Sequence, residues 1–133
     1  MDKNMKILVV DDDVSFRTLY KQILEAENFQ VETADDGVQA LKLLQEGGYD
    51  LVLLDLKMPK MDGFATVENY KRTPPKTPNG PIFFLTNSED EITIAKCVAL
   101  EAQGYLIKSH YTPDKLVQEV KRILEAEKAK IAK

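Results

Sequence analysis

The fold is decided by the stretch LVLLDLKMPKMDG, residues 51–63. Its apolar start belongs to a strand predicted at 49–54, and an unbroken apolar run is typical of a strand covered on both faces of a sheet. Asp55 follows directly, and a carboxylate beside a buried strand costs free energy unless a partner stabilises it. The Asp62-Gly63 pair then predicts a turn into a short helix that ends near Arg72. The stretch thus predicts a buried strand that delivers a carboxylate to the edge of its sheet.

Short apolar runs of the same kind alternate with helical patterns along the rest of the chain. Strands are predicted at 5–10, 31–34, 49–54, 82–85 and 104–107. Helices are predicted around 16–24, 37–46, 63–72 and 89–101, and from Thr112-Pro113 onward. This alternation indicates an α/β fold, a (βα)5 doubly wound parallel five-stranded sheet. We expect the flavodoxin-like strand order 2-1-3-4-5, which is borrowed from that general fold type.

Smaller features complete this outline. Apolar spacing predicts that Leu19 faces the core from the first helix, and that Val38, Leu41 and Leu44 do so from the second. Either Asp13 or Ser15 can cap the first helix. We interpret the proline-rich segment 73–81 as a stiff connector, and we expect Gly63 to permit a backbone turn that other residues resist.

Composition limits the classes of protein that fit. The length of 133 residues suits one domain, so we expect a single domain over 1–133. The net charge of −4 argues against a general nucleic-acid-binding surface. The single cysteine, Cys97, rules out an internal disulfide. No apolar run approaches the length of a membrane span and the start lacks a signal peptide, so a cytoplasmic location is predicted.

Polar side chains follow four of the predicted strands, where each strand ends. They are Asp11 and Asp12 after the first strand, Asp55 after the third, Thr86 after the fourth and Lys108 after the fifth. In a doubly wound sheet these ends share one edge, so we expect the side chains to converge. Crowded carboxylates repel one another, and a divalent cation with a preference for oxygen ligands, such as Mg²⁺, relieves the conflict. Asp55 can then act as a nucleophile that forms an aspartyl phosphate, with Lys108 as a point charge and Thr86 as a hydroxyl donor.

Four motifs at these strand ends resemble a known family. They are VVDDD (9–13), LLDLKMPKMDG (53–63), FLTN (84–87) and GYLIK (104–108). Together they look like the CheY-like receiver domain of two-component response regulators, over about residues 5–127. The DxxMPxMDG pattern with an upstream acidic pair is highly specific for that family.

The resemblance implies a role for each matching residue. Asp55 takes a phosphoryl group from a histidine kinase phosphohistidine. Mg²⁺ is bound directly by Asp12, through water by Asp11, and by the backbone carbonyl of Lys57 as well as by Asp55. The switch pair is formed by Thr86 and Tyr105, which reshape the face made by the fourth helix, the fifth strand and the fifth helix. Lys57 and Ser88 match positions that tune hydrolysis of the phosphoryl group.

The resemblance also implies the biological setting. We expect a stand-alone response regulator in phosphorelay signal transduction, which is not an enzyme apart from assisting its own phosphorylation and dephosphorylation. Its partners would be a sensor histidine kinase or phosphotransfer protein and a downstream protein target, with no direct contact to nucleic acid or membrane. It would be a monomer or a phosphorylation-dependent homodimer.

One residue departs from the family pattern, which usually has proline after the lysine of the fifth strand. Here Ser109 follows Lys108. A cis bond before serine costs about 2.5–4 kcal/mol, far more than before proline. Either the loop is trans and Lys108 sits differently, or local contacts hold the strain.

Two alternatives remain open from the sequence. Asp11-Asp12-Asp13-Val14 and FLTN (84–87) also resemble motifs of haloacid-dehalogenase-type phosphatases, in which Asp11 would be the nucleophile and Asp13 the acid/base. That family needs a further acidic pair, which we do not find after Lys108. The other alternative is a receiver-like scaffold that docks partners without phosphorylation.

Overall fold

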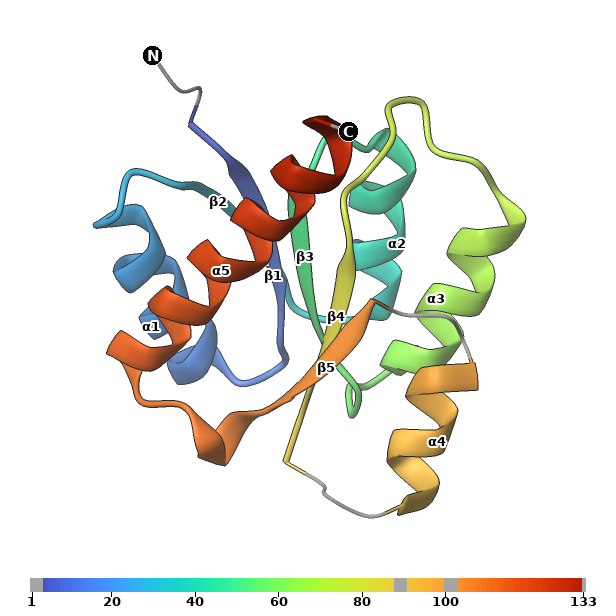
Figure 1. Cartoon of the computed structure of the whole chain (residues 1–133). Helices are drawn as coiled ribbons and strands as arrows, with labels where there is room; N and C mark the ends of the chain where they lie inside the picture. The colour runs from blue at the N-terminus through green and yellow to red at the C-terminus, as the bar shows by residue number, and fades with distance from the viewer. Residues whose placement is uncertain (1–3, 88–90, 100–102, 133) are drawn as a thin grey trace.

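The computed structural model describes residues 4–87, 91–99 and 103–132. Five parallel strands form one sheet in the order β2-β1-β3-β4-β5 (Figure 1). The strands are β1 (Lys6–Val10), β2 (Gln30–Ala34), β3 (Leu51–Asp55), β4 (Ile82–Thr86) and β5 (Gly104–Ile107). The helices are α1 (Val14–Glu25), α2 (Gly37–Glu46), α3 (Gly63–Arg72), α4 (Glu91–Ala99) and α5 (Pro113–Ala132), with a 3-10 turn η1 at Lys108–His110. The predicted fold class and strand order are confirmed.

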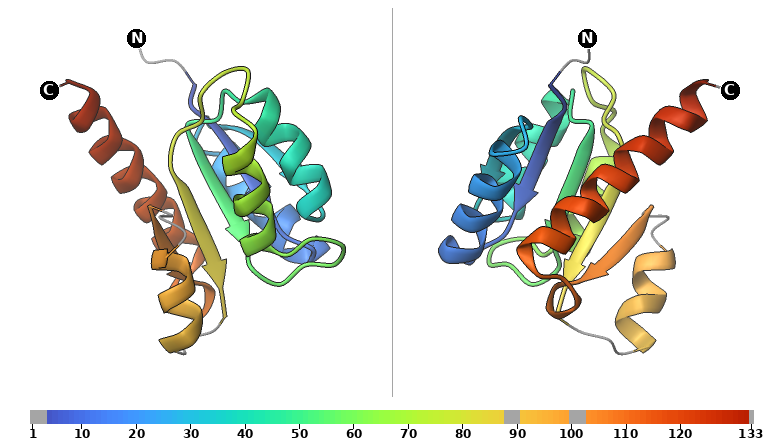
Figure 2. Two further views of the ribbon diagram at one scale, coloured as in Figure 1. Left: turned by 90° about the vertical axis from the view of Figure 1, so that its right-hand side faces the viewer. Right: turned by 60° about the vertical axis from the view of Figure 1, so that its left-hand side comes forward.

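The helices cover both faces of the sheet. Residues of α1 and α5 pack with β1 and β3 in one apolar cluster that includes Leu24 and Leu116. Residues of α2, α3 and α4 pack in a second cluster that includes Leu44, Val67 and Cys97. Figure 2 shows α5 on one side of the sheet and α2 and α3 on the other. Because β1 and β3 are covered on both faces, Ile7–Val10 and Leu51–Leu54 are fully buried, as their unbroken apolar runs predict.

Two helix residues expected in the core are on the surface instead. Leu19 is 40% exposed and Val38 is 39% exposed. In α1 the fully covered positions are Tyr20 and Leu24, and Leu19 is rotated away from them. In α2 the covered residues are Gly37, Ala40 and Leu44, at the i, i+3, i+7 spacing of one helix face. The inner face of α2 therefore begins with two small residues, Gly37 and Ala40, and Val38 falls outside it.

The role expected of Gly63 is also different in the structure. Its φ is not in the left-handed region, where the structure places Gly47 and Gly48 among the glycines. A Cβ at Gly63 would lie 2.5 Å from the carbonyl oxygen of Asp55, while its N–H donates to the Leu56 carbonyl at 2.9 Å. The glycine is thus required for close approach of α3 to the end of β3. In the same loop Lys60 takes a positive φ of 67°.

The proline-rich segment connects α3 to β4 and is also tied to the α2–β3 connection. The Asn79 side chain accepts from the Tyr49 N–H at 3.1 Å and donates to the Leu44 carbonyl at 2.9 Å and to the Tyr70 hydroxyl at 3.1 Å. Thr77 forms an isolated parallel bridge with Gly47. We call the contact made by Gly47, Gly48, Thr77 and Asn79 the base clamp, because it lies where the strands begin.

None of the helices in the described part of the chain is long and apolar enough to cross a membrane.

Candidate functional site

A pocket of about 400 Å³ lies at the edge of the sheet where the strands end, toward which the arrows point in Figure 1. It is lined by Asp11, Asp12, Asp13, Asp55, Leu56, Lys57, Thr86, Asn87 and Lys108. Four strand ends thus contribute polar side chains to one pocket, in the arrangement that the sequence predicts for Asp11, Asp12, Asp55, Thr86 and Lys108. The order β1-β3-β4-β5 makes this possible, because these strands are neighbours in the sheet.

Asp11 is fully buried and has partners for its polar atoms. Its Oδ1 accepts from the Asp13 N–H at 3.0 Å, and its Oδ2 lies 2.7 Å from Lys108 Nζ. Arg17 Nη1 donates to the Asp11 carbonyl oxygen at 2.6 Å, and Arg17 Nη2 lies 3.5 Å from Asp35 Oδ1. The backbone and the side chain of Asp11 are therefore both fixed by cationic neighbours.

Asp55 lies at the end of β3 and is 7% exposed. Burial, and after it the nearby Asp11 charge, raise the pKa of its carboxyl from 3.8 to about 7, while Lys108 opposes the shift. The charged form of Asp55 is therefore costly in the metal-free protein. An added positive charge next to Asp55 would lower that cost.

The carboxylates of this pocket suit a hard divalent cation. Asp11, Asp12 and Asp55 each offer an oxygen atom, and these atoms lie within 4.8 Å of one another. Asp12 is exposed, so a cation can approach from solvent. Oxygen ligands from a few carboxylates, completed by water, are the set that Mg²⁺ prefers. The residues present therefore fit a magnesium ion.

Lys108 is 11% exposed and reaches into the same pocket. Its Nζ lies 2.7 Å from Asp11 Oδ2, 3.6 Å from Asp55 Oδ2 and 4.4 Å from the centroid of the Phe16 ring. The peptide bond to Ser109 is trans, and Lys108 begins the 3-10 turn η1. Of the two alternatives for this loop, the trans form is the one that the structure has, and Lys108 still meets the carboxylates.

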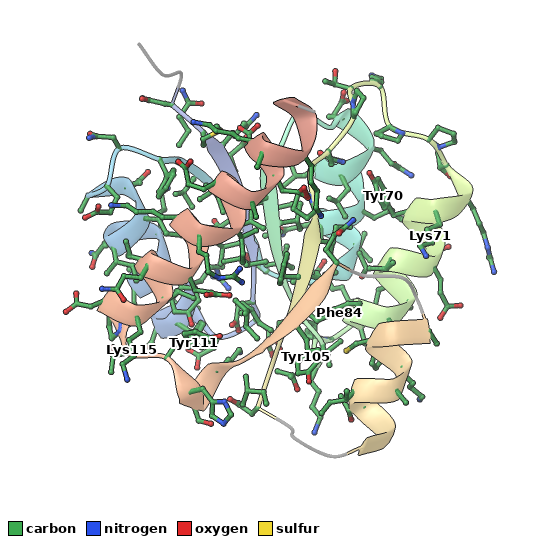
Figure 3. All side chains as sticks on the ribbon, viewed as in Figure 1. Tyr70, Lys71, Phe84, Tyr105, Tyr111 and Lys115 are labelled. Carbon is green, nitrogen blue, oxygen red and sulfur yellow. The ribbon has the colours of Figure 1, made fainter. Side chains whose placement is uncertain are left out.

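The other residues with a predicted role at the site differ from one another in location and exposure. Thr86 is buried at the end of β4 and pairs in register with Ile107. Tyr105 is half-buried on β5 opposite Phe84 of β4, and both are labelled in Figure 3. The side chain of Lys57 is exposed, in the loop after β3. Ser88 lies outside the described residues.

Three residues next to the pocket were not predicted. Arg17 and Phe16 lie in the first turn of α1, and Asn87 follows Thr86 at the pocket wall. A signal for Arg17 exists in the sequence, since a cation one helical turn after an acidic triplet can fold back onto it. No local pattern links Phe16 to Lys108, because the contact joins the two ends of the chain.

Asp13 has a structural role in α1. Its carboxylate accepts from the N–H groups of Ser15 at 2.9 Å and Phe16 at 3.2 Å, so it is the N-cap of the helix. The phosphatase alternative needs this carboxylate as a proton donor and acceptor. A carboxylate engaged by two backbone N–H groups is held as an acceptor, which disfavours that alternative.

The chain is similar to known proteins over most of its length. Residues 7–121 match the family described as Response regulator receiver domain. The transcriptional regulatory protein CpxR homolog of Haemophilus influenzae is 38% identical over 119 residues, which are 90% of this chain and 50% of the relative. CpxR of Escherichia coli is 39% identical over 90% of this chain and 49% of the relative. The chain thus spans about half the length of these curated relatives.

Solved structures give the same picture. The chemotaxis response regulator CheY4 of Vibrio cholerae has a TM-score of 0.75 at 31% identity and covers 91% of this chain and 99% of its own. A CheY-like response regulator receiver domain protein of Methanospirillum hungatei has a TM-score of 0.84 at 26% identity, covering 96% and 99%.

Proposed function

We propose that this chain, which belongs to the response regulator receiver domain family, accepts a phosphoryl group on Asp55 and thereby transmits a signal. The family acts in two-component signalling and generally has no enzymatic activity of its own. The observation that carries the proposal is the placing of a buried carboxylate, Asp55, within 3.6 Å of Lys108 and beside two further carboxylates. A pocket of this kind favours a nucleophile paired with charge neutralisation.

The transfer itself is a displacement at phosphorus. An Asp55 carboxylate oxygen forms a bond to phosphorus while the bond from phosphorus to the donor histidine nitrogen breaks. The electron pair of that bond stays on the imidazole, which takes up a proton from water. Asp55 must be ionised to attack, and the Lys108 ammonium lowers the pKa of its carboxyl toward that state.

Asp11, Asp12, Asp55 and the backbone carbonyl of Lys57 would hold Mg²⁺. The bound cation supplies positive charge for the phosphoryl oxygens and for the crowded carboxylates. Lys108, which follows β5, contributes a second positive charge, and because its side chain is only 11% exposed, water competes little for its ammonium. Thr86 donates its hydroxyl to a phosphoryl oxygen from the end of β4.

The same residues support a switch. Thr86 ends β4, and Tyr105 lies on β5, which pairs with β4 along its length. Movement of the Thr86 hydroxyl toward the phosphoryl group opens space that the half-buried Tyr105 ring can enter. The change would reshape the α4–β5–α5 face and alter the binding of a downstream protein.

The partners follow from this chemistry. A sensor histidine kinase or phosphotransfer protein would donate the phosphoryl group, and an effector protein would read the switched face. We further propose that residues 1–133 form a single receiver domain, with Lys57 and Ser88 tuning the lifetime of the phosphoryl group.

Acetyl phosphate with Mg²⁺, followed by intact-mass measurement, tests the proposal. The wild-type chain should gain the mass of one phosphoryl group, and Asp55→Asn should gain none. Asp50→Asn is the matched control, because Asp50 precedes the same strand at its other end and should leave uptake unchanged. No gain in wild type would leave the scaffold alternative as the better explanation, and a gain that persists in Asp55→Asn would contradict Asp55 as the acceptor. Chelation of Mg²⁺ should also prevent uptake.

A further inference from the structure

We propose that Phe16, on α1, is a positioning residue for Lys108. The face of the Phe16 ring holds the Lys108 ammonium next to the carboxylates of Asp11 and Asp55. The inference rests on the proposed function, because it assigns a partner to the lysine of that site. It concerns a residue that neither the motifs nor the family match singles out.

The contact geometry is that of a cation–π interaction. Lys108 Nζ lies 4.4 Å from the Phe16 ring centroid, within the distance at which an ammonium is attracted to the ring face. The same nitrogen lies 2.7 Å from Asp11 Oδ2 and 3.6 Å from Asp55 Oδ2. The ammonium therefore has two anionic partners and one neutral partner at once.

The ring belongs to a rigid part of α1. The Phe16 N–H donates to the N-cap carboxylate of Asp13 at 3.2 Å. Its ring centroid lies 3.9 Å from that of Tyr20, with the planes tilted by 44°, and Tyr20 is 4% exposed. Phe16 is thus fixed from its backbone and from its ring, and it can act as a support for a flexible side chain.

Lys108 needs such a support more than most lysines at a strand end. Its side chain has four rotatable bonds, and fixing their conformation costs free energy. Ser109, in a trans peptide, adds no ring to stiffen the turn η1. The two carboxylates attract the ammonium in the metal-free protein, but they are also the groups that would hold a divalent cation. When a divalent cation shares the negative charge of the two carboxylates, their attraction for Lys108 weakens. The neutral Phe16 ring then still attracts the ammonium.

The size of the effect can be bounded. Cation–π contacts contribute from about 0.5 to about 2 kcal/mol as they become desolvated, and Lys108 is largely buried. Loss of the ring should therefore slow phosphoryl uptake by about 2- to 30-fold. Acetyl phosphate is the appropriate donor, since a small molecule does not depend on a docking surface of α1.

The experiment compares substitutions that separate the ring face from its volume. Phe16→Leu keeps an apolar side chain without a ring and should slow uptake of the phosphoryl group, while Phe16→Tyr should restore most of the rate. Phenylalanine analogues with one, two and three fluorines at position 16 should slow uptake stepwise, because fluorine weakens the ring face with little change of shape. Phe29→Leu is the matched control, since Phe29 packs against the same apolar cluster beyond the other end of α1. It should leave the rate unchanged.

A second measurement uses the metal-free protein and no phosphodonor. The NMR signals of the Lys108 Cε protons should be shifted upfield by the ring current of Phe16 and should lose that shift in Phe16→Leu. If the wild-type chain takes up no phosphoryl group, the proposed function is contradicted. The NMR shift still tests the contact between Phe16 and Lys108 in that case. A normal rate in Phe16→Leu, a loss that does not follow fluorination, or an unshifted Lys108 signal each overturns the positioning role.

Discussion

The two ends of the five-stranded sheet are held together by different interactions. Where the strands end, Asp11, Asp55 and Lys108 bring charges together at low exposure. Where the strands begin, the base clamp joins backbone groups through the neutral amide of Asn79 and through the close approach of Gly47 to Thr77. One end depends on ionisation and the other does not.

This difference separates function from stability along the same strands. Each satisfied neutral hydrogen bond contributes about 1 kcal/mol net, at any ordinary pH. Ionised carboxylates that repel one another lower the free energy of unfolding until a cation binds. We therefore expect substitutions at the base clamp to lower stability without changing phosphoryl uptake. Substitutions among the carboxylates should change uptake and can raise stability.

The largest effect is expected for Gly47→Ala. Gly47 has φ 81° and ψ −171°, a conformation essentially restricted to glycine, and an added Cβ would lie 1.6 Å from the Thr77 carbonyl oxygen. Strain and clash together should lower the free energy of unfolding by about 3 kcal/mol or more, measured by urea denaturation. Gly48→Ala is the matched control. Its φ is 93°, but the nearest atom to its Cβ is 4.0 Å away, so a loss of about 1–2 kcal/mol is expected. Equal losses would show that the contact with Thr77 does not matter.

A smaller loss is expected for Asn79→Ala. The substitution removes three hydrogen bonds and leaves the Tyr49 N–H and the Leu44 carbonyl without this partner. The free energy of unfolding should fall by about 2–3 kcal/mol, which is measured as a lower midpoint of thermal unfolding. Lys76→Ala, which removes an exposed ion pair with Glu46, should cost less than about 0.5 kcal/mol. If Asn79→Ala also abolished phosphoryl uptake, the two ends of the sheet would not be independent.

The sequence predicts the charged end of the sheet better than the base. Buried parallel strands appear as unbroken apolar runs, and their ends share one edge, so the meeting of Asp11, Asp55 and Lys108 follows from strand order alone. The family resemblance read from the same motifs is confirmed by the match over residues 7–121. Periodicity and strand-end chemistry thus carry information about sites that lie on strands.

The remaining features depend on contacts that no local pattern encodes. Apolar spacing predicts Val38 in the core, whereas Ala40 lies on the inner face of α2, where the helix packs closely. The Asn79 amide and the Phe16 ring each reach partners far along the chain. Their residue types are common in loops and helices, so their roles became visible once the strands and helices were placed in space.

The smallest expected effect has the opposite sign, and it comes from Asp55→Asn in the metal-free protein. Burial, together with the Asp11 charge, raises the pKa of Asp55 from 3.8 to about 7 in the folded state. The folded protein thus holds this proton more tightly than the unfolded chain does. The contribution to stability is fully present below pH 3.8 and is lost as pH rises through about 7. Asparagine cannot ionise, so the variant should be more stable than wild type at pH 8.

The free energy of unfolding should rise by about 1–2 kcal/mol. The gain is limited because asparagine loses the attraction between Asp55 and Lys108, whose charged atoms lie 3.6 Å apart. It should decline as pH falls from 7 toward 4, and excess Mg²⁺ should narrow it by stabilising wild type alone. Asp50→Asn, at the base end of β3, keeps an acceptor for the Lys6 N–H and should show no such gain. A variant no more stable than wild type at pH 8 would mean that Lys108 already compensates the buried charge of Asp55. In that case the charged end would resemble the base clamp, with its interactions satisfied before any ligand binds.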